Sequence, residues 1–425
     1  MDDSGGLRRA AVSRGPRVKH VLVVFGTRPE AIKMAPVVAA LRARGDALRT
    51  TVCVTAQHRE MLDQVLSLFG IVPDVDLALM RPGQSLTELA SAVLVAVDGV
   101  LKQQQPDVVL VHGDTTTAMA TALAAFHRQV PIGHVEAGLR SGRMDAPFPE
   151  EMNRVVIDRV AAHLFAPTPG AASNLRAEGV EESKVTVTGN TAIDALLQVR
   201  RRLPAMDLAI RTTLGDRARL VLVTAHRREA FGKPFVELLA GHEAVARAHP
   251  DITFVYPVHL NPNVKGPALE RLSAPNVLLV DPVDYASLVW LLDRAEFVLT
   301  DSGGIQEEAP ALGKPVLVLR DVTERPELIA AGAGLLVGTN AARIEREAGR
   351  LLDDPAHRAA MGRPRALFGD GRAATRIAAR LAGEAVRPWF PTDEAPGATA
   401  VARPSAPLPG PLPPPTPPTS APVAP

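Results

Sequence analysis

Short apolar runs rich in Val and Leu alternate along the chain with longer segments of helical periodicity. In the first half these runs are "HVLVVFGT", "TTVCVTA", "DVVLVHGD", "PIGHVEAG", "HLFAPT" and "KVTVTGN". Strands that are apolar almost throughout are typical of parallel sheets covered by helices on both faces. The pattern therefore predicts an α/β fold.

The second half repeats this alternation with "RLVLVTAHR", "ITFVYPVH", "NVLLVDPV", "FVLTDSGG" and "PVLVLRD". Two doubly wound domains fit 425 residues better than one sheet of a dozen strands. We predict two such domains, over 18–200 and 201–371, joined by a polar hinge in "QVRRRLPAMDLAIRTTLGDRAR". A cleft between them would be bordered by the carboxyl ends of both sheets, where open α/β sheets bind ligands.

Two flanking segments do not fit the pattern. Residues 1–17 are polar and contain Gly and Arg, and residues 391–425 are rich in Pro. Proline cannot continue a helix or a central strand, so both segments are predicted to be disordered. The Pro-rich tail is interpreted as a solvated extension, with binding to a partner's groove as the alternative.

Composition excludes several classes of function. A formal charge of +1 and 4% aromatic residues give no reason to expect nucleic acid or an anionic membrane as a partner. No apolar run reaches a membrane span and no secretory signal begins the chain, so a cytoplasmic location is expected. Cys53, the only cysteine, is predicted to be a core thiol, and no metal site is expected.

Polar clusters follow several predicted strands of the first half. In "VFGTRPEAIKM", Gly26 permits a turn, and Arg28 and Lys33 place cations near the start of a helix, where a phosphate can bind. In "LVHGDTTT", Asp114 is either a site residue or a helix N-cap. Glu136 in "GHVEAG" follows an apolar strand without any such structural reason.

Three further clusters complete the candidate site. Glu150 and Glu151 open a helix, which its dipole alone would favour, and His226 follows a strand within a cationic cluster. In "DSGGIQEE", Ser302, Gly303 and Gly304 can present hydroxyl and N–H groups to a diphosphate, and Glu307 or Glu308 can accept ribose hydroxyls. No Walker A or G-x-G-x-x-G pattern is present, so no dinucleotide cofactor is expected.

Taken together, the ordered motifs from about His20 to Ala385 resemble the bacterial non-hydrolysing UDP-N-acetylglucosamine 2-epimerases. They are "FGTRPEAIKMAP", "TAQHREMLDQVL", "HGDTTT", "GHVEAGLR", "PFPEEMNR", "TGNTAIDAL", "HRRE", "YPVHLNPNV", "TDSGGIQEEAP" and "GKPVLVLRDVTERPE". The resemblance implies a GT-B-like fold of two Rossmann-type domains around a deep cleft. Its last helix, over 372–390, crosses back to the first domain. It also implies a homodimer without an added cofactor, acting on UDP-GlcNAc and UDP-ManNAc for cell-envelope polysaccharide.

This reaction requires carboxylates. The C2 hydrogen of the sugar is not adjacent to a carbonyl, so without an NAD motif the remaining route is elimination of UDP to 2-acetamidoglucal and its re-addition. The resemblance assigns Asp114, Glu136 and Glu150 as acid/base carboxylates and leaves open which one takes the C2 proton. Clustered carboxylates are expected to raise one another's pKa.

The resemblance assigns the remaining roles residue by residue. His226 lies near the leaving diphosphate. Phosphate contacts come from Arg28, Lys33, Ser302, Gly303 and Gly304, and a ribose contact comes from Glu308. A regulatory UDP-GlcNAc site would comprise Gln57, His58, Gln84 and His259, although Gly83 stands where several members carry arginine.

Four other functions remain open at this stage. One is a 2-epimerase of the same mechanism that acts on a modified UDP-diacetamido sugar, and another is a hydrolysing relative that releases UDP. A retaining GT-B glycosyltransferase would share the fold and the UDP contacts but needs an acceptor site. A non-catalytic nucleotide-sugar sensor would bind UDP-GlcNAc without turnover.

Overall fold

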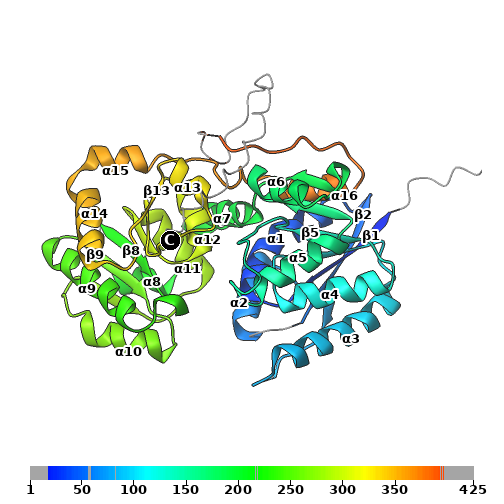
Figure 1. Cartoon of the computed structure of the whole chain (residues 1–425), viewed down its shortest axis with the longest axis horizontal. Coiled ribbons are helices and arrows are strands. Elements are labelled where there is room, and N and C mark those ends of the chain that lie inside the picture. The colour runs from blue at the N-terminus through cyan, green and yellow to red at the C-terminus, as the bar shows by residue number, and fades with distance from the viewer. Residues whose placement is uncertain are drawn as a thin grey trace, which may run out of the picture.

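The computed structural model describes residues 18–55, 59–81, 83–215, 217, 219–392, 394 and 396. The two segments predicted to be disordered lie largely outside this range, as do Gln57 and His58 of the predicted regulatory site. Figure 1 shows two α/β domains side by side, with the first sheet and its helices in blue to green and the second in green to orange.

The first domain is built on a seven-stranded parallel sheet with the order β3-β2-β1-β4-β5-β6-β7. Its strands are β1 (Lys19–Phe25), β2 (Leu48–Val54), β3 (Val75–Asp76), β4 (Val108–His112), β5 (Ile132–Val135), β6 (His163–Ala166) and β7 (Val185–Val187). The six predicted strands are confirmed. The sequence analysis missed β3 because a two-residue edge strand leaves no apolar run.

Helices cover both faces of this sheet, which explains its uniformly apolar strands. They are α1 (Arg28–Arg42), α2 (Arg59–Phe69), α3 (Leu86–Gln104), α4 (Thr116–His127), α5 (Glu150–Val160) and α6 (Pro169–Ala177). Along β1, Val21, Val23 and Phe25 pack into the core under α1 and α2, whereas Leu22 and Val24 pack into the core under α3 and α4. Cys53 is fully buried here, and burial raises the pKa of its thiol to about 12, which confirms a core role.

The second domain has a six-stranded parallel sheet with the order β10-β9-β8-β11-β12-β13. Its strands are β8 (Leu220–Thr224), β9 (Thr253–Pro257), β10 (Val277–Val280), β11 (Val298–Thr300), β12 (Val316–Val318) and β13 (Gly334–Leu336). The five predicted strands are confirmed, and β13 is an additional edge strand within "GAGLLVG". The helices are α8 (Ala209–Leu214), α9 (Lys233–Ala248), α10 (Pro262–Arg271), α11 (Tyr285–Arg294), α12 (Gly303–Glu308), α13 (Pro326–Ala330), α14 (Ala341–Asp353) and α15 (Pro355–Met361).

Helix α7 (Thr191–Arg202) lies between the two domains (Figure 1). Its Ile193, Leu196 and Val199 are buried in the same core as Leu222 of the second sheet. The segment after α7 was predicted to be a polar hinge, and its apolar side chains join this core too. The buried residues are Leu203, Leu208, Ile210 and Leu214.

The chain returns to the first domain after its second sheet. Helix α16 (Ala373–Leu381) packs Ile377 and Leu381 into the core beside α1. Trp389 follows it into the other core of the first domain, and its backbone N–H donates to Val187 O at 2.9 Å. In the described part of the chain, no helix has the length and apolar character that a membrane span requires.

Candidate active site

A cavity of about 320 Å³ lies where the carboxyl ends of the two sheets face each other. It gathers six of the predicted site residues from both domains: Asp114, Glu136, Glu150, Ser302, Gly303 and Gly304. Arg140, Arg154, Arg227, Glu324 and Arg325 also line it. The cavity is therefore strongly charged, with four carboxylates (Asp114, Glu136, Glu150 and Glu324) facing four arginines.

Glu136 directly follows β5 and has an unusual backbone. Its φ is +72°, in the left-handed region that non-glycine residues rarely adopt. The N–H groups of Glu136 and Ala137 both donate to Phe165 O at 3.1 Å, which anchors this conformation on β6. Such strain persists only where surrounding contacts enforce it, and it is common at functional sites.

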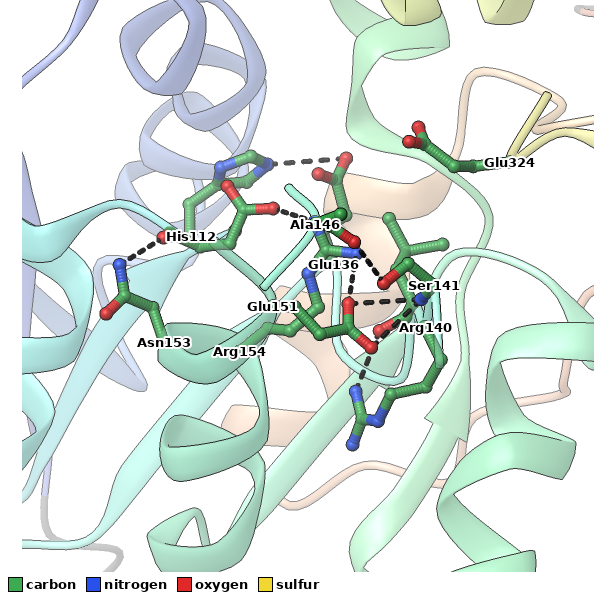
Figure 2. A network of polar contacts seen from close by, with 12 residues as sticks. His112, Glu136, Arg140, Ser141, Ala146, Glu151, Asn153, Arg154 and Glu324 are labelled. Atoms are coloured by element: carbon green, nitrogen blue, oxygen red, sulfur yellow. Dashed lines mark hydrogen bonds and ion pairs between the residues drawn. The ribbon is translucent and has the colours of Figure 1, made fainter. Parts of the chain in front are cut away.

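Three nitrogen-bearing side chains lie around the Glu136 carboxylate, and Figure 2 shows one of them, His112. Lys33 forms an ion pair with its Oε2, His112 Nε2 lies 3.7 Å from the same oxygen, and Asn190 Nδ2 lies 3.4 Å from it. Burial would raise the pKa of Glu136, but Lys33 and His112 outweigh burial and hold it well below its usual value. The expectation that neighbouring carboxylates raise this pKa is wrong, because the sequence does not reveal the cations around Glu136.

Asp114 is not a helix N-cap. Thr115 caps α4 by accepting the N–H of Ala118 at 3.0 Å, so the alternative interpretation of Asp114 is excluded. The carboxylate of Asp114 pairs with Arg154 from α5, and Asn153 Nδ2 donates to the Asp114 backbone carbonyl at 2.8 Å. Helix α5 thus fixes Asp114 at the cavity wall.

Glu150 and Glu151 begin α5 but differ in environment. Glu151 is buried and accepts the backbone N–H groups of Ser141 and Gly142 at 2.9–3.0 Å, which closes the loop after β5 (Figure 2). Among the described residues, Glu150 has no hydrogen-bond or ion-pair partner, and it lines the cavity. Glu151 is therefore structural here, whereas the carboxylate of Glu150 is available to a ligand.

His226 follows β8 and does not line the cavity. Its ring stacks on His259 at 5.5 Å, and its Nδ1 lies 3.5 Å from Asp301 Oδ1. Burial, His259 and Arg227 together outweigh Asp301 and lower the pKa of His226. The structure thus brings the predicted catalytic histidine against a residue of the predicted regulatory site, whereas Gln84 lines a separate cavity beside α3.

Gly303, the first of the paired glycines in "DSGGIQEE", has a steric reason to be glycine. A Cβ at Gly303 would come within 3.0 Å of the Arg325 guanidinium, so the missing side chain makes room for that cation. Gly26 has a similar steric reason, since its Cβ would meet the Thr55 hydroxyl at 2.2 Å. Close approach, rather than the predicted turn, therefore requires glycine at position 26.

Glu307 and Glu308 face different partners. Glu308 is buried and accepts a hydrogen bond from Tyr285 Oη at 2.8 Å. Burial, with help from the charge of Glu307 and against the Tyr285 hydrogen bond, raises the pKa of Glu308 to about 7. Glu307 instead pairs with Arg325 at 2.7 Å.

Of the predicted phosphate contacts, Lys33 and Arg28 do not line this cavity, and Arg325 lines it while paired with carboxylates. Lys33 bridges Glu136 and Glu307, and Arg28 Nη2 donates to Val283 O of the second domain at 3.1 Å. Arg325 pairs with Glu307 and Glu324. Sequence reasoning missed Asn190, Arg154 and Arg325 because their motifs, "TGN", "MNR" and "TERPE", carry no chemistry until the fold brings them to the cavity.

The described residues contain no group of three or more His, Cys, Asp or Glu arranged to hold a metal ion. Two parallel α/β domains with a charged cavity between the carboxyl ends of their sheets define the GT-B-like fold class. Within that class, the chain belongs to the UDP-N-acetylglucosamine 2-epimerase family, which matches residues 39–382.

Relatives and solved structures are similar over most of the chain. The UDP-N-acetylglucosamine 2-epimerase of Escherichia coli (strain K12) is 53% identical over 365 residues, which are 84% of this chain and 96% of the relative. The crystal structure of UDP-GlcNAc 2-epimerase from Neisseria meningitidis bound to UDP-GlcNAc is 45% identical with a TM-score of 0.81, covering 86% of this chain and 100% of that one. The enzyme from Methanocaldococcus jannaschii, in complex with UDP-GlcNAc and UDP, is 32% identical with a TM-score of 0.73, covering 85% and 99%.

Proposed function

We propose that this chain catalyses the reversible interconversion of UDP-GlcNAc and UDP-ManNAc. The observation that carries the proposal is the single cavity that gathers Asp114, Glu136 and Glu150 from the first domain and Ser302–Gly304 from the second. Family membership supports the same substrate, since the Neisseria relative is bound to UDP-GlcNAc.

The proposed reaction proceeds by elimination and re-addition. A carboxylate removes the C2 proton while the C1–O bond to UDP breaks, which gives 2-acetamidoglucal and UDP. Protonation of C2 on the opposite face and return of the UDP oxygen to C1 complete the inversion. General acid/base groups of this kind typically contribute about 10²–10⁴-fold each.

The three carboxylates suit different parts of this work. Glu136 is held ionised by Lys33, as a base requires. Asp114 is paired with Arg154, and Glu150 is free to contact the sugar. We propose these three residues as the acid/base set, without assigning the C2 base to one of them.

The departing diphosphate needs hydrogen-bond donors and positive charge. We propose Ser302, Gly303 and Gly304 as its main contacts, with Arg28 and Lys33 supplying charge, His226 at the edge of the site and Glu308 on the ribose. The cavity lining supports the first three residues. A regulatory role for Gln84 and His259 remains a prediction.

We further propose that the protein is a homodimer and that it acts in the cytoplasm. Its product would supply the synthesis of cell-envelope polysaccharide. The proposal rests on the family resemblance and on the nucleotide-sugar substrate. Sedimentation of the purified chain tests the dimer directly.

Proton NMR in deuterated water tests the reaction. Purified full-length protein is incubated with UDP-GlcNAc, and the C2 and anomeric signals are followed. The expected result is UDP-ManNAc with deuterium at C2. If C2 exchange occurs with a UDP-diacetamido sugar but not with UDP-GlcNAc, the proposed mechanism stands and the substrate is the modified sugar. If C2 exchange occurs with neither sugar, the proposal is overturned.

A further inference from the structure

We propose that Glu307 of the second domain is a positioning residue for Glu136 of the first domain. It acts through two donors, Lys33 and Asn190, that the two carboxylates share. The inference rests on the proposed function and adds a connection between the diphosphate contacts and proton transfer at C2.

The shared donors bridge the two domains. Lys33 Nζ pairs with Glu136 Oε2 and lies 3.5 Å from Glu307 Oε2. Asn190 Nδ2 donates to Glu307 Oε2 at 3.0 Å and lies 3.4 Å from Glu136 Oε2. The Glu307 and Glu136 side chains are 3% and 11% exposed, so water competes little with these contacts.

The other oxygen of Glu307 is fixed within the second domain. Arg325 donates to Glu307 Oε1 from Nε at 3.0 Å and from Nη2 at 2.7 Å, and its Nη1 donates to Glu324 at 2.6 Å. The same guanidinium lies against Gly303, where a Cβ would approach it to 3.0 Å. A continuous set of contacts therefore runs from the proposed diphosphate turn through Arg325, Glu307 and the shared donors to Glu136.

Charge explains what Glu307 contributes. Lys33 is drawn toward two carboxylates, and although burial alone would lower its pKa, Glu136 and Glu307 raise it. If Glu307 were neutral, the charge of Lys33 would act on Glu136 alone, which lowers the pKa of Glu136 further and makes it a weaker base. The shared donors Lys33 and Asn190 would also lose a partner that holds them beside the Glu136 carboxylate. Glu307 thus maintains both the basicity and the placement of Glu136.

The test compares Glu307→Gln with wild type in the full-length protein. We expect kcat to fall by about 10- to 100-fold, the loss typical of a misplaced catalytic group, with KM for UDP-GlcNAc changed by less than about threefold. C2 deuterium exchange should fall in parallel with UDP-ManNAc formation, while UDP affinity measured by calorimetry stays unchanged. Glu307→Asp, which keeps the charge, should recover part of the lost kcat.

A matched control is Glu296→Gln. Glu296 also belongs to the second domain and also pairs with arginines, Arg219 and Arg358, but it does not line the cavity. This variant should retain wild-type kcat.

Two outcomes contradict the inference while the proposed function stands. One is a Glu307→Gln enzyme with wild-type kcat. The other is a variant whose UDP affinity and melting temperature fall together with kcat and are not restored in Glu307→Asp, which would make Glu307 a structural residue. A wild-type protein without turnover on either sugar overturns the proposed function itself, and the inference with it.

Discussion

Glu136 shows how one residue depends on contacts from several elements. Its backbone lies in the left-handed region, and its carboxylate receives donors from α1, α7 and the end of β4. Burial alone would favour the protonated acid, yet the nearby cations make the carboxylate the stable form. The residue is therefore ionised at neutral pH.

Replacing Glu136 with Gln tests its role as a catalytic group. We expect kcat to fall by about 10²–10⁴-fold because the amide cannot accept a proton, while UDP affinity stays within about threefold. An enzyme assay of UDP-ManNAc formation measures kcat, and calorimetry measures UDP affinity. A loss of UDP affinity that matches the loss of rate would instead make Glu136 a binding or structural residue.

At the scale of elements, α7 organises the molecule. Asn190 caps the N-terminus of α7 and contacts both Glu136 and Glu307. The apolar face of α7 packs into the core of the second domain. One turn later, Asp194 accepts the backbone N–H groups of Ala373 and Ala374 at 3.2 and 2.9 Å at the start of α16. The helix that joins the domains therefore also anchors the returning C-terminal helix.

Asp194 gives this element a pH dependence. Burial and the charge of Asp370 outweigh the two N–H bonds and raise the pKa of Asp194 from 3.8 to about 7. Between these values the folded state binds the proton and the unfolded state does not, so the stabilising effect of this group is lost as pH rises through about 4 to 7. We therefore expect the melting temperature of wild type to exceed that of Asp194→Asn by more at pH 5 than at pH 8.

Thermal unfolding at the two pH values measures this difference. Asp281→Asn, at an exposed aspartate, serves as the control and should follow wild type at both. Glu308, whose pKa is also raised, contributes in the same direction, but it is present in all three proteins and cancels in the comparison. Parallel curves for wild type and Asp194→Asn would contradict the assignment.

At the scale of the whole molecule, described residues of the segment predicted to be disordered after residue 391 form backbone hydrogen bonds with the second half of the chain. Thr392 N donates to Ala366 O at 3.2 Å, and Ala366 N donates to Glu394 O at 2.9 Å. Truncation after residue 396 should therefore leave both activity and melting temperature unchanged. A large loss of activity would show that the Pro-rich tail acts in catalysis or assembly.

A shorter chain should behave differently. Truncation after residue 385 removes Trp389, which is 4% exposed in the core of the first domain. Loss of a buried tryptophan typically costs about 3–5 kcal/mol, so the melting temperature should fall clearly. If this truncation had no effect on melting temperature, the packing of Trp389 would contribute little to stability.

The fold class, eleven of the strands and the strand ends that carry the site could be predicted from the sequence, because they follow from local apolar patterning and from residues adjacent in the chain. The sequence also indicated Asp114, Glu136, Glu150 and Ser302–Gly304, which share one cavity. Only the tertiary structure decided their surroundings. The pairing of Lys33 with Glu136, the contact of Arg325 with Gly303 and the bridging position of Asn190 join residues far apart in sequence, so pKa values and interdomain contacts depend on distances that local patterns do not encode.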